Sequence, residues 1–226
     1  QEVFPNGGGP CEYKGALLGL HGEIALLPWE YRIVEDSPER VAVCFTVETR
    51  RTPFRIEKTI SLSTSIAGIH IDEHITNKAG EAMDFMWGHH PAFGAPFLSA
   101  DCILRIPAER VTVAPGDGQS ETNITSGGTW PYVPGAGGSQ VDLSRCPAEN
   151  DRVSEMLFLT GLSDGYFEIF NERLGTGFRL EFPVSIFRYL WFWRVARGSF
   201  HYPWFGRTYT IALEPFSSMP VLSDAV

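Results

Sequence analysis

The chain has 226 residues, with 18 Lys and Arg against 27 Asp and Glu, for a formal net charge of −9. This acidic balance argues against nucleic acid as a partner, because affinity for a phosphate backbone comes from clustered Lys and Arg. No apolar run reaches the roughly 18–20 residues that span a bilayer, so we expect no membrane partner either. The four cysteines form no CxxC pair, which indicates buried free thiols in a reducing compartment, expected to be the cytoplasm.

Short β-branched and aromatic runs, separated by Gly, Pro, Asn and Asp, predict an all-β fold. Strands are expected, in chain order, at 41–47, 54–62, 69–75, 102–106, 156–159, 166–170, 178–182, 189–193 and 209–213. The clearest hairpin joins 166–170 to 178–182, because the turn between them holds two glycines that permit positive φ. The glycine-rich stretch 114–138 is expected to be a long surface loop that can act as a lid, although its role stays open. With no repeat and no linker, residues 1–226 should form a single β-sandwich domain.

Three clusters set a titratable side chain among glycine, proline and aromatic residues: 20–23 with Pro28-Trp29, 87–94, and 212–215. They contain His21, His90 and Glu214. Histidine titrates near neutral pH and can act as an acid or a base, and a carboxylate offers the complementary base. Two such groups that face each other across a sugar can move protons on and off two oxygens of one ring.

In this order and spacing, the clusters resemble the motifs of the aldose 1-epimerase (galactose mutarotase-like) family. The resemblance runs from about Phe4 to Pro220. Its parts are His21-Gly22 with Pro28-Trp29, then Ile75-Thr76-Asn77 followed by His90-Pro91-Ala92-Phe93, and finally Leu213-Glu214-Pro215 after the aromatic strand 189–193. Each motif alone is weak, whereas the ordered set on an all-β chain is more specific.

The resemblance implies a supersandwich of β-sheets with a small-molecule sugar in a cleft. The implied reaction interconverts the α and β anomers of an aldose by ring opening, with no metal and no organic cofactor. By analogy, Glu214 takes the proton from the anomeric hydroxyl, His90 protonates the ring oxygen, and His21 stabilises the charge that develops there. The oligomeric state stays open.

The chain also departs from the family pattern. Members that act on free hexoses carry an arginine ahead of the first histidine, but no arginine precedes His21, which weakens the case for free glucose or galactose. Asp164 is the candidate for the acidic residue that contacts sugar hydroxyls, with His89, Trp193 and Arg194 as further substrate contacts. Strands before the first motif and after the glutamate are missing, so we expect a fragment that is truncated at both ends.

Structural interpretations of the same residues stay open. Adjacent side chains on a strand point to opposite faces, so only one of His89 and His90 should line a cleft, and His89 can be structural. Glu214 can form an ion pair with one of the arginines at 188, 194 and 207. His70 and His74 are about 13 Å apart on a strand and cannot share a metal, so they are expected on a solvated face.

Two other functions also remain. One is a non-catalytic carbohydrate-binding relative that kept the cleft. The other is a metal-dependent β-sandwich enzyme that uses the candidate histidines together with Glu214.

Overall fold

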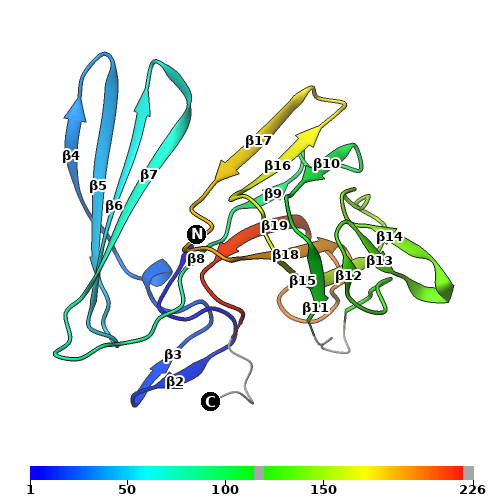
Figure 1. Ribbon diagram of the computed structural model, residues 1–226, viewed down its shortest axis with the longest axis horizontal. Helices are drawn as coiled ribbons and strands as arrows, with labels where there is room; N and C mark the ends of the chain where they lie inside the picture. The colour runs from blue at the N-terminus through cyan, green and yellow to red at the C-terminus, as the bar shows by residue number, and fades with distance from the viewer. Residues whose placement is uncertain (115–119, 221–226) are drawn as a thin grey trace. The chain divides into compact units, whose positions relative to one another are not determined.

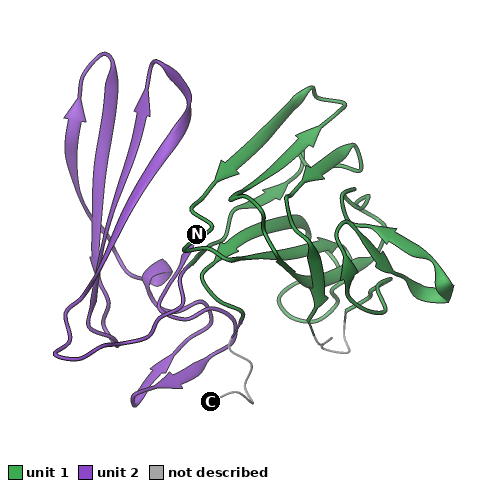
Figure 2. Ribbon diagram, viewed as in Figure 1, with its two compact units in different colours: residues 1, 88–219 green, residues 2–87, 220–226 purple. Residues whose placement is uncertain are grey.

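Antiparallel strands provide nearly all the regular structure in the computed structural model, which describes residues 1–114 and 120–220 (Figure 1). The chain forms two compact units (Figure 2): unit 1 comprises Gln1 and residues 88–219, and unit 2 comprises residues 2–87 and 220. The expectation of one domain over residues 1–226 stays a prediction. Within the described residues, no helix combines the length and the apolar character needed to cross a membrane.

Unit 2 is built on a four-stranded antiparallel sheet in the order β4-β5-β6-β7. The sheet strands are β4 (Glu30–Asp36), β5 (Arg40–Glu48), β6 (Phe54–Ser63) and β7 (Ile66–Asn77). They are preceded by β1 (Glu2–Val3), the hairpin of β2 (Cys11–Tyr13) and β3 (Ala16–Leu18), and the 3₁₀ turn η1 (Ile24–Leu26). Because the strands are successive in the chain, each pairs with its neighbour through a short turn.

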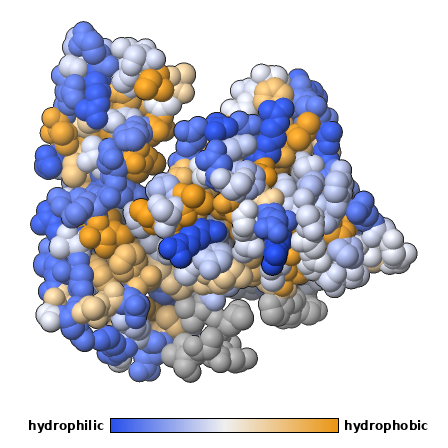
Figure 3. Space-filling view, in the orientation of Figure 1, coloured by the Kyte–Doolittle hydropathy of each residue, from blue (hydrophilic) through white to orange (hydrophobic). Residues whose placement is uncertain are grey.

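The β4–β7 sheet carries much of its apolar surface in the open. Ile33, Val43, Ile60 and Ile71 pair in one row across all four strands and therefore lie on one face. Ile33 is 64% exposed and Ile71 is 48% exposed. Figure 3 shows hydrophobic patches interspersed with hydrophilic ones over this sheet.

Unit 1 contains two antiparallel sheets. Its larger sheet has the order β8-β19-β18-β15-β11-β12-β13-β14, with β9 also paired to β19, and its smaller sheet has the order β10-β16-β17. The strands of the larger sheet are β8 (Gly88–His89), β9 (Ala92–Gly94), β11 (Arg110–Val113), β12 (Gly128–Thr129), β13 (Tyr132–Pro134), β14 (Gln140–Asp142), β15 (Val153–Thr160), β18 (Tyr189–Ala196) and β19 (Tyr209–Phe216). The smaller sheet consists of β10 (Cys102–Arg105), β16 (Tyr166–Asn171) and β17 (Thr176–Glu181), and η2 (Ala136–Gly138) is a 3₁₀ turn.

The two sheets of unit 1 enclose one hydrophobic core. The larger sheet contributes Leu157, Leu190, Phe192 and Leu213, and the smaller sheet contributes Leu104, Phe167 and Ile169. These positions alternate along their strands, so each strand commits one face to the core. The opposite face of β15, β18 and β19 points away from this core.

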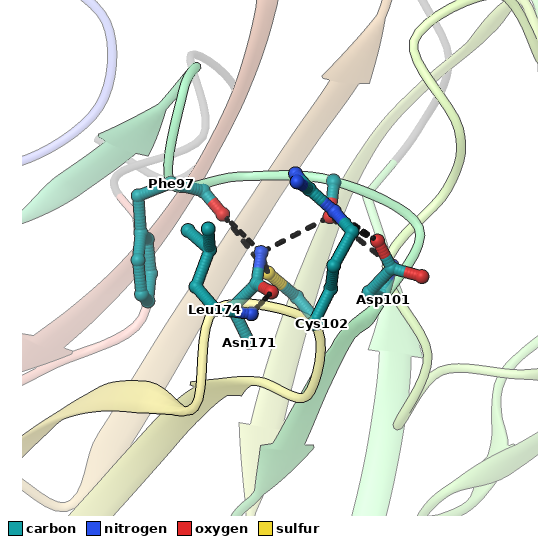
Figure 4. Close-up of polar contacts among 7 residues, drawn as sticks. Phe97, Asp101, Cys102, Asn171 and Leu174 are labelled. Atoms are coloured by element: carbon teal, nitrogen blue, oxygen red, sulfur yellow. Dashed lines mark hydrogen bonds and ion pairs between the residues drawn. The ribbon is translucent and has the colours of Figure 1, made fainter.

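A buried amide fixes the end of the β16–β17 hairpin (Figure 4). Asn171 is fully buried, and its Nδ2 donates to the Phe97 carbonyl at 2.6 Å and to the Ser99 hydroxyl at 3.1 Å. Its Oδ1 accepts from the Leu174 N–H at 2.8 Å. Because both ends of the amide are satisfied, Asn171 joins the 97–102 loop to the hairpin turn.

The strand predictions for 41–47, 54–62, 69–75, 102–106, 156–159, 189–193 and 209–213 are confirmed, as is the hairpin of 166–170 with 178–182. The strands β4 and β11 were not predicted. The expected long loop at 114–138 is wrong in part, because β12, β13 and η2 form within it, while residues 115–119 lie outside the described residues. All four cysteines are free thiols, and Cys44, Cys102 and Cys146 are buried, which confirms that prediction for these three.

Candidate functional site

Glu214 lies on the face of the larger sheet that turns away from the core of unit 1. It pairs with Trp191 across the β18–β19 ladder, and Ala212 pairs with Trp193, so these four side chains share one face. The alternate residues Leu190, Phe192 and Leu213 enter the core. Glu214 is nevertheless only 2% exposed. The carboxylate therefore stands in a mostly apolar setting on an otherwise non-core face.

Two stacked aromatic rings lie on the same face as Glu214. The Trp191 and Phe216 rings stack with centroids 3.7 Å apart. Gly88 lies directly against the Phe216 ring, where a Cβ atom would stand 2.4 Å from the ring carbons. The glycine ahead of the two histidines is thus required by close packing.

His90 is brought to Glu214 by the strands on either side of it. Gly88 pairs with Phe216 and Ala92 pairs with Ala212, so the segment 88–92 runs along β19 with His90 level with Glu214. The His90 Nε2 lies 3.4 Å from the Glu214 Oε1, and the His90 side chain is 17% exposed. Its ring meets Trp193 edge to face, at a centroid distance of 6.1 Å. Two residues 124 positions apart thus form one imidazole–carboxylate pair.

Burial determines the charge state of this pair. Removal from water raises the pKa of Glu214 from its ordinary 4.5 to about 8, because burial disfavours the ionised carboxylate. A carboxyl group with such a pKa can exchange protons near neutral pH. The side chain that faces the Glu214 carboxyl is the His90 imidazole, at 3.4 Å, whereas Arg194, one of the three arginines considered as ion-pair partners, is paired with Glu155.

A groove of about 660 Å³ opens on the same face, beside the pair. Its lining includes Met156 and Ser154 of β15, Trp193 of β18, and Trp204 from the segment after β18. The Trp193 and Trp204 rings are 5.1 Å apart, so Trp193 contacts His90 as well as the groove wall. The volume lies within the range of small-molecule sites.

The other residues predicted for the site are spread over unit 1. His89 packs edge to face against Phe187, with centroids 5.5 Å apart. Asp164 is exposed in the turn before β16, where its carboxylate accepts from the Gly165 N–H at 2.7 Å. Arg194 is buried in an ion pair with Glu155 and follows Trp193 on the strand, so it points to the opposite face. Because its guanidinium is paired with Glu155, Arg194 does not face the His90–Glu214 pair.

His21 belongs to unit 2, whereas His90 and Glu214 belong to unit 1, so their meeting stays a prediction. His21 has a left-handed backbone with φ of 60°, and its N–H donates to the Gly8 carbonyl at 3.3 Å. Burial lowers the pKa of its imidazole. In the same unit, His70 and His74 are exposed on β7, which confirms the predicted solvated face.

Sequence reasoning did not assign Trp204 and His201, which both line the groove. The available signal was the aromatic run 202–205, but nothing local indicates that this segment reaches Trp193. In residues 1–114 and 120–220, no group of three or more His, Cys, Asp and Glu side chains is placed to hold a metal ion.

Residues 4–225 match the model of the family described as a domain of unknown function, DUF4432, so the chain belongs to this family. No curated protein matches the chain. Among solved structures, it is similar to a putative aldose 1-epimerase from Klebsiella pneumoniae, with a TM-score of 0.67 and 14% identity over 94% of this chain and 52% of that one. It is also similar to a putative aldose 1-epimerase from Escherichia coli K12, with a TM-score of 0.63 and 16% identity over 97% of this chain and 72% of that one.

A third similar structure is a TPR-domain containing protein from Parabacteroides distasonis, with a TM-score of 0.61 and 14% identity over 96% of this chain and 33% of that one. At such identities the likeness establishes the fold, and it confirms the predicted all-β, galactose mutarotase-like β-sandwich. The chain spans about half the length of the Klebsiella protein, at 52%.

Proposed function

We propose that this member of the DUF4432 family is a sugar isomerase of the aldose 1-epimerase type, which interconverts the α and β anomers of an aldose. The observation that carries the proposal is the buried pair of His90 and Glu214, whose side chains approach to 3.4 Å on an aromatic sheet face. The similarity in fold to putative aldose 1-epimerases supports assignment to this type of enzyme. The His90–Glu214 pair offers the acid and the base that anomer exchange requires.

In the proposed reaction, the Glu214 carboxylate accepts the proton of the anomeric hydroxyl while the His90 imidazolium donates a proton to the ring oxygen. The bond between the anomeric carbon and the ring oxygen breaks, which leaves an open-chain aldehyde. Rotation about the C1–C2 bond and attack of the hydroxyl on the other carbonyl face give the opposite anomer. Positioned acid and base groups each contribute about 10²–10⁴-fold, which is ample for a reaction that already proceeds in water.

The pKa of Glu214 sets the pH dependence expected of this reaction. With a pKa of about 8, Glu214 is mostly protonated at neutral pH, yet it must be ionised to act as the base. The value of kcat/KM should therefore rise with pH up to about 8, because the fraction of ionised base rises. Because the two side chains lie 3.4 Å apart, the profile describes the pair as a whole rather than Glu214 alone.

Anomer exchange measured by saturation-transfer NMR on a panel of aldoses tests the proposal. The native protein should accelerate exchange of at least one sugar, and Glu214→Gln should lower kcat by roughly 10²–10⁴-fold through loss of the base. Asp72→Asn, which changes a carboxylate that is 71% exposed in unit 2, serves as the control and should leave kcat unchanged. Sugar binding without any acceleration would instead identify a carbohydrate-binding protein without turnover.

His21 is part of the proposal on the strength of its sequence motif. Its role would be to donate a hydrogen bond to the ring oxygen as charge develops there. We expect His21→Asn to lower kcat by about tenfold or more while sugar binding is retained, since the role lies in the transition state. Unchanged kcat and KM in this variant would restrict the site to unit 1.

A further inference from the structure

The groove and the His90–Glu214 pair share one continuous sheet face. Thr112 of β11 pairs with Phe158 of β15, which pairs with Trp191 of β18, which in turn pairs with Glu214 of β19. Paired residues point to the same face, so Thr112, which lines the groove, and the Glu214 carboxylate lie on the same face of the sheet. Neighbouring strands lie about 4.8 Å apart, and Met156, which lines the groove on β15, is in the row of Ala212, two residues from Glu214, which places it about 12 Å from Glu214. That separation is comparable to the length of two linked pyranose rings.

The groove lining carries few titratable side chains, and His201 is one of them. No Lys or Arg side chain appears among its lining residues in the described part of the chain. Glu155, which also lines it, is committed to the buried ion pair with Arg194. An anionic sugar, such as a phosphate or a uronic acid, would find no Lys or Arg among these described residues to offset the loss of its hydration. The groove therefore favours an uncharged ligand.

What the groove does offer is hydroxyl groups and flat rings. The hydroxyl side chains that line it include Thr112, Ser120, Thr122, Ser154 and Ser199. Thr122 donates to Glu155 at 2.8 Å, and the Ser154 and Ser199 oxygens are 2.6 Å apart, so these three hydroxyls can still accept from sugar hydroxyls through their remaining lone pairs. The indoles of Trp193 and Trp204, 5.1 Å apart, provide apolar planes for the C–H face of a pyranose.

We propose that the groove is a second sugar subsite, which binds an uncharged unit glycosidically linked to the reducing sugar at His90 and Glu214. This inference rests on the proposed function for the placement of the reducing end, whereas binding in the groove can be measured without turnover. The substrate would then be a neutral reducing disaccharide or longer chain. Trp204 is the specificity-determining residue, because it lines the groove and packs against Trp193, which in turn packs against His90.

The test measures the Kd of maltose, cellobiose and lactose by calorimetry, with glucose, galactose and glucose 6-phosphate for comparison. At least one disaccharide should bind tenfold or more tightly than its monosaccharides, and glucose 6-phosphate should show no advantage over glucose. Trp204→Ala should abolish the disaccharide advantage, and Trp204→Phe should restore most of it. Tyr202→Ala is the matched control, because Tyr202 is 79% exposed in the same segment and does not line the groove.

The outcomes separate the two proposals. If a disaccharide binds with the expected sensitivity to Trp204 but exchanges its anomers no faster than in water, the groove assignment stands and the isomerase proposal fails. If monosaccharide anomers exchange rapidly while no disaccharide binds more tightly, the isomerase stands and the groove assignment is wrong. Tighter binding of glucose 6-phosphate than of every neutral sugar also overturns the groove assignment.

Discussion

An imidazole–carboxylate pair with a short N–O separation is found among the described residues of each unit. In unit 1, His90 and Glu214 approach to 3.4 Å with side chains 17% and 2% exposed. In unit 2, His70 and Asp72 approach to 3.0 Å with side chains 72% and 71% exposed. The shorter distance belongs to the exposed pair, so proximity alone does not distinguish a candidate site.

The difference lies in the sheets that hold the two pairs. The His70–Asp72 pair lies on β7, an edge strand whose residues reach solvent along most of its length. Glu214 lies on β19, which is paired on both sides and whose last six residues are buried. Water screens the first pair, whereas the dry surroundings of the second move a pKa into the range useful for proton transfer. The same two functional groups thus differ in burial, and only the pair on β19 is largely shielded from water.

The largest expected effect comes from removing each histidine in turn. His90→Gln should lower kcat for anomer exchange on the order of 10³-fold, because it removes the proposed acid. His70→Gln removes the exposed imidazole and should leave kcat within experimental error. Equal rates for the two variants in the NMR exchange assay would show that His90 contributes no more to anomer exchange than the exposed His70.

The buried ion pair behind the site should be the next most sensitive point. Arg194→Met leaves the Glu155 charge in the interior of unit 1 without its counter-ion, although Thr122 and the Asn123 N–H still donate to it, and should lower the free energy of unfolding by about 3–5 kcal/mol. Chemical denaturation monitored by circular dichroism measures this loss. A loss below about 1 kcal/mol would mean that the hydrogen bonds from Thr122 and Asn123, or access to water, are enough to compensate the Glu155 charge.

The pH dependence of stability should reveal Glu214 itself. Its pKa is higher in the folded chain, at about 8, than its ordinary 4.5, so the folded state binds this proton more tightly. The contribution to stability is complete below pH 4.5 and is lost as pH rises to about 8, at up to about 1.4 kcal/mol per pH unit. Glu214→Gln should flatten this slope in urea titrations run at several pH values, whereas Asp72→Asn should keep it.

The smallest effect is expected at an exposed ion pair of unit 2. Arg40 and Glu35 approach to 2.6 Å, with side chains 41% and 40% exposed. Arg40→Met should change the free energy of unfolding by less than about 1 kcal/mol, because solvent screens the pair. A loss as large as that of Arg194→Met would show that burial does not determine how much each ion pair contributes to the free energy of unfolding.

The fold was more predictable than the site. Alternation within single strands, as in 54–62 and 69–75, is a local property that survives in the folded chain. The strand β4 was missed because its residues are mostly exposed and polar, and β12 and β13 because they are only two and three residues long. Such short strands are stabilised by pairing with their neighbours, and they contain too few residues to show an alternation of apolar and polar side chains.

Within the site, His90 and Glu214 were identified as separate candidates from their motifs. Their contact was not predictable, because it depends on β8 and β9 both pairing with β19. Arg194 was predicted as a substrate contact, and its observed pairing with Glu155 was not predictable for a related reason. Its neighbour Trp193 faces the groove, so alternation turns the guanidinium toward Glu155.

By itself, the sequence determined the all-β class, most of the strands, and the residue types available for acid–base chemistry. Those follow from side-chain alternation and turn propensities, which act over a few residues. Only the tertiary structure decided which carboxylate is dehydrated, which imidazole meets it, and which aromatic segment closes the groove. These outcomes depend on pairing between strands far apart in the chain, and that pairing is set by the packing of the whole unit.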